Sequence, residues 1–246
     1  MQERNPFSMP QARQGIYGSE DPREIPAYTV AEAAHYLLIP PATLRSWVAG
    51  RYYPVRGGKK FFHPVIEVPR KGDHLLSFVN LVEAHVLEAI RRRHDVPLSQ
   101  VRSAIQYLRK QFAARHPLAD QRIETDGRDL FVRKLGALIN ITREGQLAMQ
   151  ELLEAHLRRI EWDASGFAAR LYPFTRKREN HEPRVVVIDP RVSFGRPVLA
   201  GTGIPTAIIA ERYKAGESIE QLANDYKRKP LEIQEAIRCE LTLRAA

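Results

Sequence analysis

The sequence has few of the residues from which metal and disulfide sites are built. Its 246 residues include a single cysteine, Cys239, which excludes an internal disulfide and any site of clustered thiolates. The eight histidines are scattered, and no two of them flank a glutamate at the spacing of a helical zinc site. We therefore expect no metal and no other cofactor, and the lone cysteine favours a reducing cytoplasm.

Long apolar runs and catalytic motifs are also missing. No stretch approaches the roughly 18 apolar residues that a membrane span needs, and the N-terminal MQERNPFSMP lacks the apolar core of a secretory signal. The sequence has no G-x-S-x-G nucleophile motif and no phosphate-binding loop. Its acidic residues do not cluster as a two-metal nuclease requires. We expect a cytoplasmic protein that is not an enzyme.

The chain has fewer acidic than basic residues, and most of this imbalance lies in one segment. The chain has 38 Lys and Arg against 29 Asp and Glu, a formal net charge of +9. Residues 42–71 hold seven basic residues and one acidic residue, Glu67, interleaved with five aromatic residues. Basic and aromatic residues in alternation are typical of a surface that follows nucleic-acid phosphates. A solvated charged face is the alternative interpretation.

Local signals around this basic segment predict a winged helix-turn-helix. Thr29 and Glu32 form the pattern of a capping box, which predicts a helix from residue 30 to about residue 37. Pro40 and Pro41 break that helix, and a second one is expected over 42–49, ended by Gly50. Residues 52–68 contain a Gly-Gly turn between β-prone runs, which favours a hairpin wing.

This segment resembles the winged helix-turn-helix of MerR-type regulators. The matching residues are Tyr28 to Ala34, Ala42 to Trp47 and the basic wing from Arg56 to Phe62. The sequence departs from that family at Leu38, where a glycine is usual, and at Pro40, where a serine cap is usual. The resemblance implies that the second helix enters the major groove and the wing holds the backbone beside it. The residues expected to contact DNA are Thr43, Arg45, Ser46, Arg51, Arg56, Lys59 and Lys60.

The central region is predicted to be helical, with one hairpin. Helices are expected over 76–93, from Pro97 to about residue 112, and over 144–162, while RIETDG and RDLFVRKL within 121–141 indicate two strands. The first two helices carry more apolar side chains than a surface pair needs. Packing against a second copy of the chain and packing against the rest of the same chain both explain this. The residues assigned to dimerisation are Val82, Val86, Val101, Ile105, Leu108 and Phe112.

The last segment follows a charged, Pro-flanked linker at 173–184. A buried-type strand at 185–188, a turn at Asp189-Pro190 and a glycine-containing loop from Gly195 to Pro205 precede helices expected at 206–214, 218–226 and 230–243. These residues resemble the domain of unknown function catalogued as family 433, through I-D-P-x-V, G-x-P-V-(x)2-G-T-G/R-I-P and A-G-x-S-(x)3-L. Such domains occur in VapB-like antitoxins paired with PIN-like ribonuclease toxins. A purely structural role for the three loop glycines, as left-handed turns, is the alternative.

Together these patterns predict a mainly α fold with small β elements (α+β), in five parts. They are a flexible arm (1–26), the winged helix-turn-helix (27–72), a helical and hairpin dimerisation region (73–172), the linker (173–184) and a C-terminal toxin-binding domain (185–246).

The predicted function is that of an antitoxin whose C-terminal domain holds a PIN-like (VapC-like) ribonuclease toxin. Such an enzyme gathers carboxylates around a divalent metal, so a guanidinium can bind in its cleft. The candidates for this contact are Arg191, Arg196 and Arg212. The N-terminal part would bind double-stranded operator DNA as a homodimer and repress its own operon. The alternatives are a MerR-like regulator that senses a small ligand through residues 75–172, and a DNA-bound adaptor without a toxin.

Overall fold

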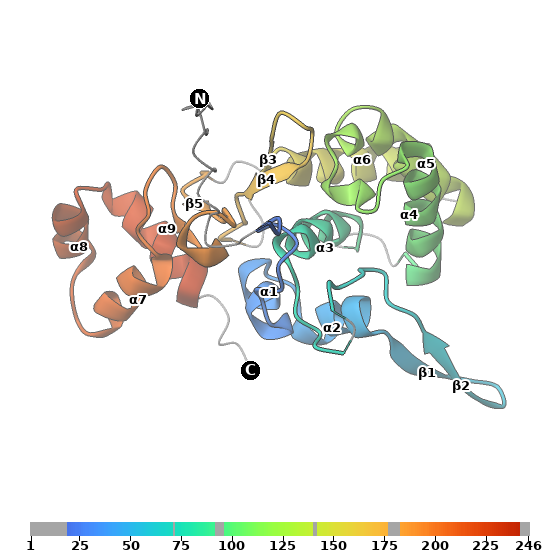
Figure 1. The fold of residues 1–246 in the computed structure, drawn as a ribbon, viewed down its shortest axis with the longest axis horizontal. Coiled ribbons are helices and arrows are strands. Elements are labelled where there is room, and N and C mark those ends of the chain that lie inside the picture. The colour runs from blue at the N-terminus through green and yellow to red at the C-terminus, as the bar shows by residue number, and fades with distance from the viewer. Residues whose placement is uncertain (1–18, 71, 92–95, 140–141, 177–182, 242–246) are drawn as a thin grey trace, which may run out of the picture.

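The computed structural model describes residues 19–70, 72–91, 96–139, 142–176 and 183–241. Figure 1 shows a helical body with a long hairpin reaching out from one end and a separate group of helices at the other. Within these residues the helices are accompanied by three two-stranded antiparallel sheets, so the expected mainly α fold with small β elements is confirmed. No helix in the described part of the chain is long and apolar enough to cross a membrane.

Two short helices at the N-terminal end form the helix-turn-helix. α1 (Val30–Tyr36) begins with the predicted capping box, in which the Thr29 hydroxyl accepts from the Glu32 amide and Glu32 accepts from the Thr29 amide. α2 (Pro41–Ala49) buries Trp47 completely. Between them Leu38 has a φ of 55°, the left-handed conformation that favours glycine. Leu38 thus adopts the left-handed turn at the position where MerR-type sequences usually have a glycine.

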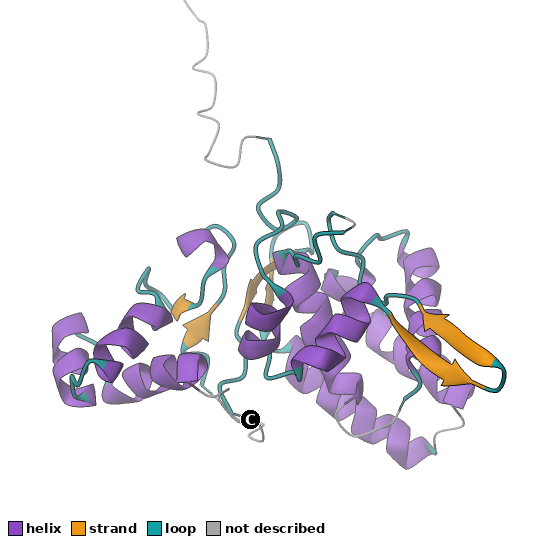
Figure 2. Cartoon of the chain, turned by 90° about the horizontal axis from the view of Figure 1, so that it is seen from below, coloured by secondary structure: helices purple, strands orange, loops and turns teal. Residues whose placement is uncertain are grey.

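The predicted wing is present as an antiparallel hairpin. β1 (Arg51–Val55) pairs with β2 (Gly58–Phe62), with Arg51 opposite Phe62 and Val55 opposite Gly58. Gly57 has a φ of 95°, which makes the tight turn possible. Both faces of the hairpin are exposed, and Figure 2 shows it extending away from the helices. The wing is therefore accessible to a partner over most of its length, while Phe62 at its base packs against the body.

The body is built around α3 (Phe78–Arg91), which packs against α6 (Arg143–Leu157). The strands predicted within 121–141 are wrong: residues 121–123 form a short 3-10 helix, η2 (Gln121–Ile123), and α5 (Asp126–Ile139) follows and packs on α4 (Leu98–Phe112). Gly127 lies in the first turn of α5, and a Cβ there would lie 2.6 Å from the Phe112 ring. The helix predicted to run to residue 162 ends at Leu157. The chain then turns into β3 (Ile160–Trp162), which pairs with β4 (Ala168–Leu171).

The apolar stripe assigned to dimerisation does not lie on a free surface. All six side chains are at most 9% exposed and belong to one continuous core within the single chain. The alternative, packing against the rest of the same chain, accounts for their apolar character. These residues are Val82, Val86, Val101, Ile105, Leu108 and Phe112. Homodimer formation stays a prediction, and it needs a different surface.

The C-terminal module has its own small core and also joins the body. The three helices predicted in this segment are present: α7 (Thr206–Lys214), α8 (Ile219–Tyr226) and α9 (Pro230–Leu241). They pack around a core that includes Leu199, Ile209 and Leu222. Two strands of two residues each, β5 (Val186–Val187) and β6 (Val198–Leu199), precede these helices. The short 3-10 helix η3 (Ser193–Gly195) lies between the two strands in the sequence. Ile188 pairs with Leu171 of β4 and is part of the core of the body.

The two segments expected to be an arm and a linker are partly packed. Of the arm predicted over 1–26, residues 1–18 lie outside the described residues, and Arg23 pairs with Asp163 at 2.6 Å. Of the linker predicted over 173–184, residues 177–182 lie outside the described residues, while Thr175 and Arg176 bond the buried carboxylate of Glu235 in α9. The described part of the first segment is therefore tied to the body, and that of the second is tied to the C-terminal module. Another short 3-10 helix, η1 (Pro117–Ala119), completes the body.

Candidate functional site

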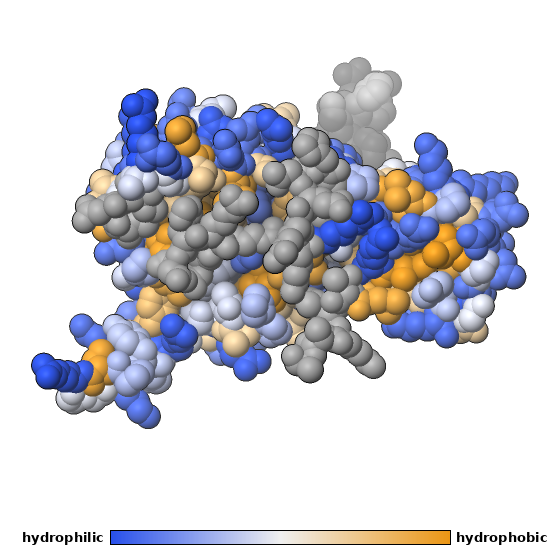
Figure 3. All heavy atoms as spheres, turned by 180° about the vertical axis from the view of Figure 1, so that it is seen from behind, coloured by the Kyte–Doolittle hydropathy of each residue, from blue (hydrophilic) through white to orange (hydrophobic). Residues whose placement is uncertain are grey.

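The exposed face of the helix-turn-helix and wing carries a group of unpaired cations. Arg45 projects from α2, and the others lie along the hairpin and its turn; none of them forms an ion pair with any residue that the structure describes. These cations are Arg45, Arg51, Arg56, Lys59 and Lys60. Figure 3 shows the wing from behind as a mostly hydrophilic projection. Cations without an intramolecular partner are free to neutralise phosphates.

The structure separates the two polar residues that were expected near the groove floor. Thr43 is partly exposed on α2. Ser46 is only 8% exposed, and its hydroxyl donates to the Thr43 carbonyl at 2.7 Å. Along α2, Arg45 lies on the exposed side of the helix, whereas Ser46 lies on the side of the buried Trp47. Ser46 is therefore not available to DNA, and this expectation is wrong.

The wing also exposes aromatic rings, which the cation-based prediction did not include. Tyr52 is 70% exposed, and its ring centroid lies 4.9 Å from that of Phe61 on the opposite strand. At the base of the hairpin Gly50 has a φ of 74°, and a Cβ there would lie 2.3 Å from the Phe62 carbonyl oxygen. This close approach fixes the direction of the wing relative to α2. The alternation of basic and aromatic residues was the signal that could have identified them.

Of the three arginines assigned to toxin binding, two have intramolecular partners. Arg196 pairs with Glu32 of the α1 capping box at 2.6 Å, across 164 positions of the sequence. Arg212 pairs with Glu217 and Asp225 and lies over the Tyr226 ring. Arg191 is exposed and has no ion pair with a described residue. The structure does not bring the three together into one patch.

The glycine loop contacts the DNA-binding half of the chain. Tyr28, just before α1, is buried and donates its hydroxyl proton to the Gly195 carbonyl at 2.8 Å. Gly195 has a φ of 76°, and a Cβ there would lie 2.3 Å from the Tyr28 hydroxyl oxygen. Gly201 also has a left-handed φ, of 73°, whereas Gly203 does not and its Cβ would meet nothing within 4 Å. The proposed turn role thus holds for two of the three loop glycines, and Gly195 has a packing role as well.

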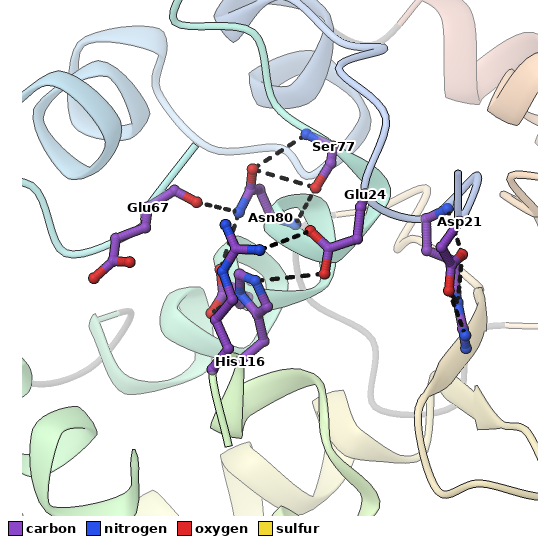
Figure 4. Close-up of polar contacts among 9 residues, drawn as sticks. Asp21, Glu24, Glu67, Ser77, Asn80 and His116 are labelled. Atoms are coloured by element: carbon purple, nitrogen blue, oxygen red, sulfur yellow. Dashed lines mark hydrogen bonds and ion pairs between the residues drawn. The ribbon is translucent and has the colours of Figure 1, made fainter. Parts of the chain in front are cut away.

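A buried polar cluster lies behind the helix-turn-helix (Figure 4). His116 is 3% exposed, and its Nδ1 lies 3.1 Å from Glu83, while its Nε2 lies 3.6 Å from Glu24. Asn80 donates to the Glu67 carbonyl and to Glu83, and accepts from Ser77. The cluster ties α3 to the segment after the wing and to the N-terminal segment. Among the described residues no group of three His, Cys, Asp or Glu side chains is placed to hold a metal ion.

The charge of His116 should make the stability of the protein depend on pH. Burial lowers the pKa of this imidazole, but the hydrogen bond that it donates to the Glu83 carboxylate, together with the charges of Glu83 and Glu24, outweighs burial and raises the pKa. A raised pKa in the folded state gives a stabilisation that is complete below the unfolded value of about 6.5 and is lost as the pH rises through the folded value. His116→Gln should therefore destabilise most at low pH, by about 1–3 kcal/mol.

Thermal unfolding of the wild type and of His116→Gln, measured from pH 5 to pH 9, tests this expectation. The difference between the two proteins should shrink above about pH 6.5. His63→Gln, at an exposed imidazole on the wing side, is the control and should change the unfolding temperature only slightly. A constant difference for His116→Gln across the range would show that its charge is not involved.

Comparison with known proteins finds two families in the chain. The family described as "Putative DNA-binding HTH domain" matches residues 26–105, and the family described as "Protein of unknown function (DUF433)" matches residues 186–238. The first match covers α1, α2, the wing, α3 and the first half of α4, and the second covers the glycine loop, α7, α8 and most of α9. A DNA-binding helix-turn-helix domain and a DUF433 domain are therefore both present.

Relatives from Mycobacterium tuberculosis (strain ATCC 25618 / H37Rv) match almost the whole chain. "Putative antitoxin VapB45" is 30% identical over 231 residues, which are 87% of this chain and 93% of the relative. "Uncharacterized protein Rv2308" is 29% identical over 217 residues, 85% of this chain and 88% of the relative. The crystal structure of Rv2018 from the same species has a TM-score of 0.62 and 28% identity, and the match covers 87% of this chain and 98% of that one. The chain belongs to the family of VapB-like antitoxins that carry a DNA-binding helix-turn-helix domain before a C-terminal DUF433 domain.

Proposed function

We propose that this protein is the antitoxin of a type II toxin-antitoxin system. It neutralises a PIN-like, VapC-like ribonuclease through its C-terminal region and binds the operator of its own operon through the winged helix-turn-helix. The observation that supports the proposal is the presence of both matched domains in one chain that is 30% identical, over 87% of its length, to a relative named a putative antitoxin. As a regulator of this kind the protein acts by binding rather than by catalysis.

The DNA-binding part of the proposal is supported by the unpaired cations. Arg45 on α2 and Lys59 and Lys60 on the wing face solvent without an acidic neighbour among the described residues. A helix that enters the major groove and a hairpin beside it would place these side chains against phosphates of one half-site. Two half-sites about one helical turn apart require a two-fold dimer, so the homodimer is part of the proposal.

The proposal predicts a partner in the neighbouring gene. That gene should encode a small protein with several spaced acidic residues, because a PIN-like ribonuclease gathers carboxylates around its metal. Co-expression of the full chain should restore the growth of cells that express this protein, and the two should purify together. A chain with Arg45, Lys59 and Lys60 replaced by Ala should still restore growth, since these residues lie outside the C-terminal module. Growth arrest that the full chain does not relieve would contradict the proposal.

A cavity near α2 gives the ligand-sensing alternative a specific place. A cavity of about 600 Å³ lies between α2 and the segment after the wing, lined by Val48, Ile66 and Arg115 among others. Only Arg115 comes from the region at 75–172 to which the alternative assigned the ligand. If the alternative holds, a small molecule changes operator affinity and the protein from the neighbouring gene does not. If the antitoxin proposal holds, the reverse is expected.

A further inference from the structure

The turn that opens the glycine loop is left-handed over three consecutive residues. Ser193, Phe194 and Gly195 have φ values of 48°, 54° and 76°. This conformation is unfavourable for residues other than glycine, and it is uncommon for bulky side chains. Strain that persists in a folded protein is a feature of sites where the conformation serves a function.

The strained turn holds a phenylalanine in solvent. The Phe194 side chain is 72% exposed, so it adds little to the apolar core. The turn itself is firmly held: the Gly195 amide donates to the Val192 carbonyl at 2.9 Å, and the Arg196 amide donates to the Ser193 carbonyl at 3.0 Å. The Tyr28 hydroxyl and the carboxylate of Glu32 fix the residues that follow. An exposed, rigidly presented aromatic ring is the kind of residue that anchors a protein interface.

Phe194 borders a cleft that both halves of the chain form. The cleft has a volume of about 240 Å³, and one wall is the N-terminal segment with Pro22, Ile25 and Pro26. The other wall is the turn, with Pro190, Phe194 and Arg196. Figure 1 shows the N-terminal segment beside the C-terminal module, in agreement with the bond between Tyr28 and Gly195. The lining is mainly apolar, so an apolar side chain is the occupant that its chemistry suits.

Two exposed arginines lie beside the cleft. Arg191 is exposed without an ion pair to a described residue, and the Arg196 side chain remains 44% exposed although it pairs with Glu32. The nearby acids Asp21 and Glu32 already have arginine partners. An acidic partner therefore complements this rim, and a ribonuclease with clustered carboxylates has such a surface.

We propose that Phe194 and this cleft are the anchor site for the toxin. Phe194 enters an apolar pocket of the toxin, a toxin side chain enters the cleft, and Arg191 pairs with a toxin carboxylate beside it. The inference rests on the proposed antitoxin function and adds the place and chemistry of the contact. Because residues 22–28 form one wall, the site is complete only in the full chain and not in residues 181–246.

The strain provides a sharp test with a matched control. Phe194→Gly removes the ring and supplies the residue that the backbone conformation favours, so the full chain should unfold at an unchanged or higher temperature. Its affinity for the purified protein from the neighbouring gene should fall by about 30-fold or more, the loss typical of an interface anchor. Ser193→Gly relieves strain at the adjacent residue but keeps the ring, so its affinity should equal that of the wild type. Ile208→Ser, at a 47% exposed apolar residue of α7, should also leave affinity unchanged.

Calorimetric affinities of these full-length proteins and the solution mass of the free chain separate the outcomes. Wild-type affinity of Phe194→Gly, or an equal loss in Ile208→Ser, would overturn the inference. A change in the solution mass of free Phe194→Gly with toxin affinity kept would assign the cleft to a second copy and would also overturn it. A wild-type chain that does not bind at all would instead contradict the proposed function.

Discussion

Replacement of Arg45, Lys59 and Lys60 by Ala in one chain should weaken operator binding about 500-fold for each half-site at 0.1 M salt. These cations lie on α2 and the wing and have no ion-pair partner among the described residues, so their removal should leave the fold intact. Each phosphate contact contributes about 0.9 to the slope of log K against log salt. The slope should therefore fall by about 2.7 units for each half-site. Fluorescence anisotropy with operator DNA at several salt concentrations measures both quantities.

A control with the same loss of charge shows whether position matters. Lys110, Arg143 and Lys214 are exposed cations on α4, α6 and α7, away from the wing. Their replacement by Ala changes the net charge equally and should leave the salt slope unchanged. Equal slopes for the two triple variants would mean that bulk charge, and not the helix-turn-helix surface, accounts for the binding.

Gly195→Ala should lower the free energy of unfolding by about 2–4 kcal/mol, which is the largest effect expected from a single added methyl group in this loop. A left-handed alanine costs about 1–2 kcal/mol. The new Cβ would also lie 2.3 Å from the Tyr28 hydroxyl, so Tyr28 must move and its buried hydrogen bond is lost, at about another 1–2 kcal/mol. Urea unfolding of the full chain measures the difference.

The other loop glycines make a graded series with Gly195. Gly201→Ala should cost only about 1–2 kcal/mol, because its φ is left-handed but nothing lies within 4 Å of the added Cβ. Gly203→Ala should change stability by less than about 0.5 kcal/mol, because neither reason applies. If the three substitutions lower the free energy of unfolding by the same amount, the contact with Tyr28 does not explain why residue 195 is glycine.

Short-range signals predicted the helix boundaries well. The capping box at Thr29 begins a helix as expected, and the helix predicted from residue 218 also begins with a capping box, at Ser218, because side chain and backbone satisfy each other within four residues. Pro97 and Pro230 stand at helix starts, and Gly50 ends α2 with a left-handed φ. These features depend on neighbours in the sequence, so the sequence alone can identify them.

Features that depend on distant residues were not predictable in the same way. The Asp126-Gly127 pair has the pattern of a hairpin turn, but Gly127 is needed where the Phe112 ring approaches the start of α5. The apolar stripe on α4 would have the same sequence whether it packed on a second copy or on the same chain. In the structure it packs on α5 of the same chain. Arg196 looked free because its partner Glu32 lies in the other half of the sequence. No sequence pattern pointed to Phe194, because its left-handed backbone conformation and its exposure are features of the folded structure.

We propose that one chain both inhibits a ribonuclease and binds its own operator. The most direct test is a titration of the purified protein from the neighbouring gene, with its divalent metal and an RNA substrate, by the full chain. We expect RNA cleavage to fall to zero at a fixed ratio of the two proteins, with operator binding retained in the same samples. Full RNA cleavage in the presence of saturating chain that still binds the operator would contradict the account.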